Sequence, residues 1–119
     1  MIAIEPGYAL AYAMIAGAYS YLGATGQELP RKAFEIVYRY AQKALKLDSS
    51  IAEGHTAIAG AYLFYERNWK KAYEALQTAL HLNPGYVEVY ELLSFYYVLM
   101  GKNDQAVKIM EKAEELDPL

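Results

Sequence analysis

The chain has 119 residues, of which 55% are hydrophobic, and a formal net charge of −3. This length suits one domain, and the acidic balance argues against a surface that binds the phosphate backbone of nucleic acids. The sequence has no cysteine, which excludes disulfides, thiol nucleophiles and cysteine-ligated zinc and suits a reducing, cytoplasmic compartment.

The first predicted element is an uncharged helix over residues 8–22. It belongs to a run of 17 residues without charge, Tyr8 to Ala24. A membrane span needs about 20 predominantly apolar residues, and this run is shorter and rich in tyrosine. We interpret it as a helix buried on most of its faces and expect no membrane contact. The preceding segment has no basic residues and contains Glu5-Pro6, so it does not resemble a signal peptide.

Five further helices are predicted, so that the six form three pairs. The first helices of the pairs cover approximately residues 8–22, 52–65 and 86–99, and the second helices approximately residues 30–47, 69–82 and 103–116. Pro30 suits a first helical turn, and Asn68 and Asn103 are expected N-caps. Gly23 and Gly101 are expected to end helices with a positive φ.

A short phrase that stops a helix recurs along the chain. Its four copies are Glu5-Pro6, Asp48-Ser49, Asn83-Pro84 and Asp117-Pro118. Successive copies are 43, 35 and 34 residues apart, counted from Pro6 to Ser49, Pro84 and Pro118. Because the last three copies each follow a helical stretch rich in alanine and leucine, a period near 34 predicts an array of helical hairpins.

The third pair carries the fullest set of residues at characteristic spacings. They are Tyr90, Leu93, Ser94, Tyr97, Gly101, Ala106, Met110, Ala113 and Pro118. With this set, the chain resembles the tetratricopeptide repeat (TPR) family over essentially its whole length. Departures occur in the second repeat, where His55 replaces an aromatic residue, Ser49 replaces a proline, and one residue is added near 66–68. The first repeat is nine residues longer than the family length, in part within residues 24–29.

The resemblance implies an all-α fold, a right-handed superhelical array of three TPR-type hairpins with six helices. We expect a single domain over residues 1–119, with repeats at approximately 7–49, 50–84 and 85–118 and with residues 1–6 as the tail of a preceding repeat. The long first hairpin and the aromatic-rich turn after it resemble repeats of bacterial regulators that carry a winged-helix or nucleotide-cyclase domain. The expected setting is therefore a larger bacterial cytoplasmic protein in signalling or transcription regulation.

In the TPR family, the first helices of the repeats line a concave groove that binds peptides. Helical spacing then assigns the following residues to the groove: Leu10, Ala13, Met14, Gly17, Tyr21, Glu53, Thr56, Ala57, Gly60, Phe64, Glu88, Glu91, Leu92, Phe95 and Leu99. The groove combines apolar walls with three glutamates, which favours an amphipathic helix or extended peptide with apolar anchors and a basic end. We therefore expect a non-catalytic protein–protein interaction module.

Two alternative functions stay open. Solenoids usually end in a polar capping helix, whereas the last helix here would leave Val107, Ile109 and Met110 partly uncovered. The chain could therefore be a self-association module. A small-ligand sensor is the other alternative, because Gly17 and Gly60 could open a pocket in the groove.

The sequence contains no constellation of residues typical of a catalytic or metal site. His55 and His81 fall on different predicted helices, whereas a zinc site needs three or four convergent ligands. The segment Gly23–Gly26 lacks the Lys-Ser/Thr that follows a phosphate-binding loop. We therefore expect neither an enzyme nor a cofactor or metal.

Two further partner classes are expected to be absent. TPR domains that bind chaperone C-terminal tails hold the carboxylate with basic and amide residues. The matching positions here hold Ala13, Gly17, Ala57, Glu88 and Leu92, so we expect no chaperone tail. A basic stripe on the second helix, formed by Arg39, Lys43 and Lys46, is interpreted as a solvated outer face rather than a nucleic-acid site. The expected partner is a protein or peptide, or another copy of the chain.

Overall fold

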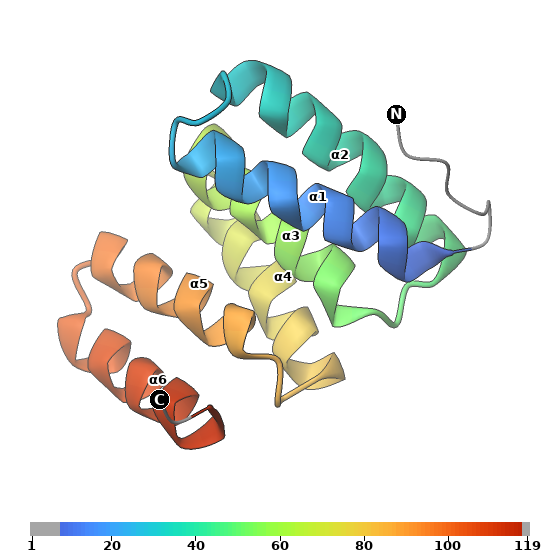
Figure 1. Ribbon diagram of the computed structural model, residues 1–119. Coiled ribbons are helices and arrows are strands. Elements are labelled where there is room, and N and C mark those ends of the chain that lie inside the picture. The colour runs from blue at the N-terminus through green and yellow to red at the C-terminus, as the bar shows by residue number, and fades with distance from the viewer. Residues whose placement is uncertain (1–7, 118–119) are drawn as a thin grey trace.

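A computed structural model describes residues 8–117 as six α-helices and one turn of π-helix (Figure 1). In chain order the elements are α1 (Ala9–Ala24), α2 (Pro30–Leu47), α3 (Ala52–Ala61), the π-helical turn η1 (Tyr62–Glu66), α4 (Trp69–Leu82), α5 (Val87–Leu99) and α6 (Asn103–Leu116). The all-α prediction with six helices is confirmed. The expected tail at residues 1–6 and Pro118 of the last stop phrase lie outside the described residues.

The helices form three hairpins: α1 with α2, α3 and η1 with α4, and α5 with α6. The helix α3 is central, since it packs along α1 and α2 on one side and against α4 on the other. By contrast, α5 touches α3 and α4 at fewer places. Figure 1 accordingly shows the α5–α6 hairpin, in orange and red, standing apart from α1 and α2. The third hairpin is therefore the least extensively attached.

Small residues lie where the helices cross closely, and large residues fill the space between them. One core cluster joins Phe34 and Val37 of α2 to alanines of α1 and α3. A second cluster joins Leu76 of α4 to Val89 and Leu93 of α5. No helix within residues 8–117 is both long enough and apolar enough to cross a membrane.

The predicted helix boundaries hold best where proline or asparagine marks a helix start. Pro30 is the first residue of α2, as predicted. Asn68 caps α4, because its Oδ1 accepts a hydrogen bond of 3.2 Å from the backbone N–H of Lys71. The prediction for Asn103 is wrong: Asn103 is already the first residue of α6, and its side chain makes no capping bond.

The prediction that Gly23 ends a helix with positive φ is wrong. Gly23 lies inside α1 and is buried, and a Cβ atom there would come within 2.9 Å of Ala33 Cβ on α2. The residue is small because α1 and α2 cross closely at this point. The positive φ belongs to Gly26 in the following turn, whereas Gly101 has a φ of 75°, as expected.

The extra residue of the second repeat coincides with the π-helical turn η1. A residue added to an α-helix can be accommodated by widening one turn, and such turns are frequent at functional sites. The turn ends at Arg67, which has a left-handed φ of 55°. It directs Tyr62 and Tyr65 towards aromatic rings of α2 and Phe64 towards α5.

Candidate interaction groove

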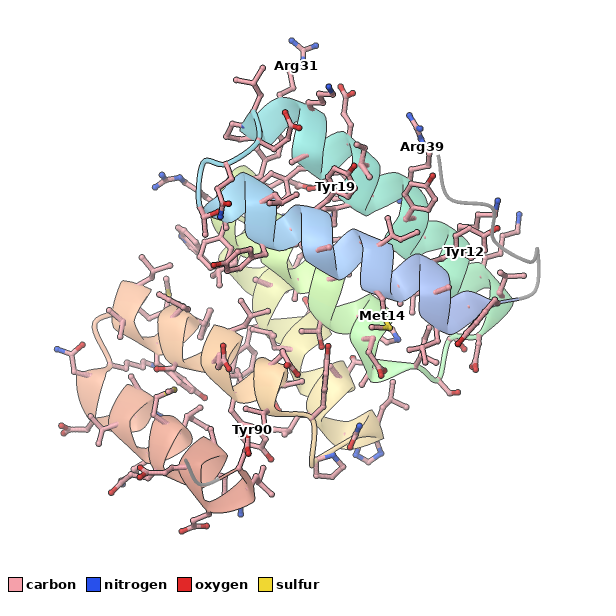
Figure 2. All side chains as sticks on the ribbon, viewed as in Figure 1. Tyr12, Met14, Tyr19, Arg31, Arg39 and Tyr90 are labelled. Carbon is pink, nitrogen blue, oxygen red and sulfur yellow. The ribbon has the colours of Figure 1, made fainter. Side chains whose placement is uncertain are left out.

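A groove of about 530 Å³ lies between α1, α3 and α5. The structure brings most of the predicted groove residues together along it: Ala13, Met14, Gly17, Tyr21, Glu53, Thr56, Ala57, Phe64, Glu88, Glu91, Leu92 and Phe95. Figure 2 shows Met14 projecting from α1 on the side of the helix nearer to α5. Three helices that are distant in sequence thus contribute to one concave surface.

The floor of the groove, between its walls, is formed by small side chains of α1 and α3. Ala13, Thr56 and Ala57 are buried there. The Thr56 hydroxyl donates a hydrogen bond of 2.8 Å to the carbonyl oxygen of Ala52, so its polar group is already satisfied. At Gly17 a Cβ atom would meet nothing within 4 Å. This floor therefore allows the close approach of another chain.

The walls of the groove are formed by large apolar side chains with exposed surface. Phe64 of η1 and Phe95 of α5 pack edge to face, with ring centroids 5.7 Å apart. Phe95 remains 54% exposed, and Met14 and Tyr21 on the opposite wall are 63% and 64% exposed. Apolar surface concentrated in this way on a concave site is typical of an interaction surface.

One end of the groove is acidic. Glu53, Glu88 and Glu91 line it together with Tyr86. Burial raises the pKa of Tyr86 to about 12, and the three carboxylates add to the shift because they disfavour a second negative charge nearby. No lysine or arginine within residues 8–117 lines the groove. Its electrostatic character is therefore negative.

The raised pKa of Tyr86 predicts a loss of stability in alkali. The folded chain keeps the phenol proton up to a pH of about 12, whereas an unfolded tyrosine loses it near 10. The free energy of unfolding should therefore fall as the pH rises through this window. Urea denaturation at pH 9, 10 and 11 measures the fall, and Tyr86→Phe should make it smaller. An identical fall in the variant would contradict the proposed environment of Tyr86.

Three predicted groove residues do not line the groove. Gly60 is buried, and a Cβ atom there would clash with Ser20 Oγ, so Gly60 marks the contact between α3 and α1. Leu10 lies nearer the start of α1 and is half-buried, and Leu99 lies in the last turn of α5. The expected opening at Gly60 is therefore wrong, because helix packing occupies this space.

The sequence reasoning missed four residues that line the groove. They are Ser20, Ala24, Thr25 and Tyr86. The prediction ended the first helix at residue 22, whereas α1 continues to Ala24 and thereby brings its last turn into the groove. Ser20 and Tyr86 lay inside predicted helices, but helical spacing assigned neither to the groove. In the structure Tyr86 is the N-cap residue of α5, so its side chain does not follow the helical period.

A second hollow, of about 710 Å³, lies along α5 and α6 on the side away from α4. Val107 and Met110, two of the predicted self-association residues, are exposed and line it. Ile109, the third of these residues, is partly uncovered as expected but does not line the hollow. Ile109 is half-buried and packs against the core cluster that joins α4 and α5, because it lies on the opposite side of α6.

The two histidines lie apart. The His55 ring is half-buried, with Nε2 at 2.9 Å from the carbonyl oxygen of Ser49, and His81 is exposed. Within residues 8–117, no three histidine, aspartate or glutamate side chains are close enough together to hold a metal ion.

Residues 63–119 match a family model described as tetratricopeptide repeat. The matched segment begins in η1 and includes α4, α5 and α6, whereas the long first hairpin lies before it. No curated protein matches the chain.

Proposed function

Since the chain belongs to the tetratricopeptide repeat family, we propose that the groove between α1, α3 and α5 binds a peptide or a short helical segment of a partner protein, without catalysis. The observation that carries this proposal is the combination of a small floor and exposed apolar walls in one groove of about 530 Å³. Repeats of this family generally mediate protein–protein interactions.

The floor and walls support a ligand with large apolar anchors. Ala13, Gly17 and Ala57 leave space above them, and Met14 and Phe95 offer apolar contacts on either side. An amphipathic helix presents such anchors at positions i, i+3 or i+4, and i+7. Burial of each anchor contributes about 1.5–3 kcal/mol before the cost of ordering the peptide is subtracted.

The acidic end supports a ligand that carries lysine or arginine near one end. Glu53, Glu88 and Glu91 lie together there, and no basic side chain of the described residues neutralises them within the groove. A carboxylate of the ligand would be repelled at this place. Electrostatic complementarity would also set the direction in which the peptide lies.

The test is a selection of 15-residue peptides from a random display library, with affinities measured by fluorescence anisotropy. Selected peptides should share helically spaced apolar residues and a basic end. The triple variant Glu53→Gln, Glu88→Gln, Glu91→Gln should raise the Kd of such a peptide about tenfold at low salt and much less at high salt.

A matched control removes three negative charges elsewhere. The variant Glu111→Gln, Glu114→Gln, Glu115→Gln lies on α6, outside the groove, and should leave the Kd nearly unchanged. Equal weakening by both variants would mean that net charge alone attracts the peptide. Unchanged binding in the groove variant would contradict the proposed basic end.

The wider setting that we propose is a bacterial cytoplasmic regulatory protein with repeats at approximately 7–49, 50–84 and 85–118. This part of the proposal is supported only by the sequence resemblance of the long first hairpin and the aromatic-rich turn that contains η1. A small-ligand sensor is not proposed, because Gly60 is buried under α1 and does not enlarge the groove.

A further inference from the structure

We propose that copies of this chain associate head to tail, through two different faces at opposite ends of the array. The trailing face is formed by Val98, Val107, Met110, Glu111 and Glu114 of α5 and α6. The leading face is formed by Ala11, Ile15, Ala18 and Leu22 of α1 with Lys32, Arg39 and Lys43 of α2. Neither face includes a residue of the groove floor, so this proposal does not rest on the proposed function.

The trailing face is apolar at its centre and acidic around it. Val98, Val107 and Met110 are exposed and line the hollow along α5 and α6. The carboxylates that line the same hollow are Glu91, Glu111, Glu114 and Asp117. Among residues 8–117, no lysine or arginine lines it. A partner surface that matches it is apolar at its centre and basic at its edge.

The leading face begins with a partly exposed apolar side of α1. Ala11, Ile15, Ala18 and Leu22 recur at intervals of four, three and four residues, so they lie on one side of the helix. They are partly or fully exposed. The helix α1 carries no charged residue, and a helix that is apolar on all sides is normally covered on all sides. This side of α1 therefore offers an apolar surface to a second copy.

The basic part of the leading face comes from α2. The Nζ atom of Lys43 lies 4.6 Å from the centroid of the Tyr12 ring, which places this lysine beside α1. Lys32 and Arg39 are exposed on α2, and Figure 2 shows Arg39 projecting outward from this helix. The only ion pair found within residues 8–117 joins Arg31 to Glu35, with Nε and Oε1 3.8 Å apart. Lys32, Arg39 and Lys43 thus form no ion pair with another described residue, and Lys43 contacts only the face of the Tyr12 ring.

The packing inside the chain supplies the geometry for such a contact. The first helix of the second hairpin, α3, packs on both α1 and α2 of the hairpin before it. If α1 of a second copy takes the same place against α5 and α6, its α2 lies on the side of α6, as α4 of this chain packs through Ala75 against the cluster that contains Phe34 and Val37 of α2. The lysines and arginine of the leading face then lie near Glu111 and Glu114. In this arrangement the apolar parts of the two faces meet, and the basic part of one meets the acidic part of the other.

Because the two faces differ, the contact is heterologous and can be repeated from copy to copy. The average mass of the 119-residue chain in light scattering should therefore rise continuously with concentration instead of reaching that of a dimer. A mass of one chain at every concentration up to the solubility limit would overturn the proposal, as would a closed dimer.

Two blocked variants separate head-to-tail association from a symmetric dimer. Ala18→Glu blocks the leading face and Met110→Glu blocks the trailing face; both positions are exposed, so both variants should fold, which circular dichroism checks. Each variant alone should remain almost entirely monomeric. Mixed in equal amounts, they should form a one-to-one dimer through the two intact faces. Absence of this dimer would overturn the proposal.

A control and a charge reversal complete the test. Thr78→Glu adds the same negative charge at an exposed position of α4, away from both faces, and should associate like the parent chain. The pair Arg39→Glu, Lys43→Glu should weaken association about tenfold. Adding Glu111→Lys and Glu114→Lys in the same chain should restore it. Restoration supports the proposed pairing, whereas further weakening would contradict it.

Discussion

Replacing Leu93 by alanine is expected to lower the free energy of unfolding by about 3 kcal/mol. Leu93 is 0% exposed and belongs to the core cluster that joins α5 to Leu76 of α4. The substitution removes buried methyl groups and leaves a cavity that the helices can fill only in part. Urea denaturation followed by circular dichroism measures the loss.

The effect of Leu93→Ala should be concentrated in the third hairpin. The helix α5 touches α3 and α4 at few places, whereas α3 packs extensively against α1, α2 and α4. In repeat proteins each unit contacts only its neighbours, so a terminal unit can open while the others stay folded. Amide hydrogen exchange should therefore accelerate most in α5 and α6. Equal acceleration in α1 and α2 would show that the chain unfolds as one unit.

Leu99→Ala is the matched control for this experiment. It makes the same chemical change in the same helix, but Leu99 is 51% exposed. The free energy of unfolding should change by less than about 0.5 kcal/mol. A loss as large as that of Leu93→Ala would indicate that Leu99 is covered in solution, for example by another copy of the chain.

The second large effect is expected on binding. Gly17→Arg should raise the Kd of a peptide selected for the groove at least about a hundredfold, because the new side chain occupies the groove and places a positive charge near its glutamates. A Cβ atom at Gly17 meets nothing within 4 Å, so the variant should remain folded. Fluorescence anisotropy measures the loss, and circular dichroism checks the fold.

Gly17→Ala is the control for this variant. It adds only a methyl group to open space and should leave the Kd within about twofold. It should also stabilise the chain by about 0.5–1 kcal/mol, because glycine is unfavourable inside a helix. Full binding by Gly17→Arg would exclude the groove as the peptide site. Ala57→Arg would not serve this purpose, because Ala57 is 4% exposed and contributes to the core.

Local sequence signals were sufficient to predict the helices. The bounds of α2, α4 and α6 agree with the prediction, because proline or asparagine begins these helices or precedes them and a stop phrase ends each of them. The apolar period of about 3.6 residues also placed most groove residues on the correct side of their helices. The family signature in the third repeat was confirmed by the match to residues 63–119.

The sequence by itself therefore determined the number of helices, their pairing and the direction of most side chains around each helix axis. Only the tertiary structure decided how closely neighbouring helices approach. Because α3 and α1 approach closely, Gly60 is buried between them, and Gly23 is buried where α1 approaches α2. The packing of α5 on α3 places Tyr86 in the groove. The physical reason is that helical periodicity is a local property, whereas the separation of two helices depends on all the side chains between them.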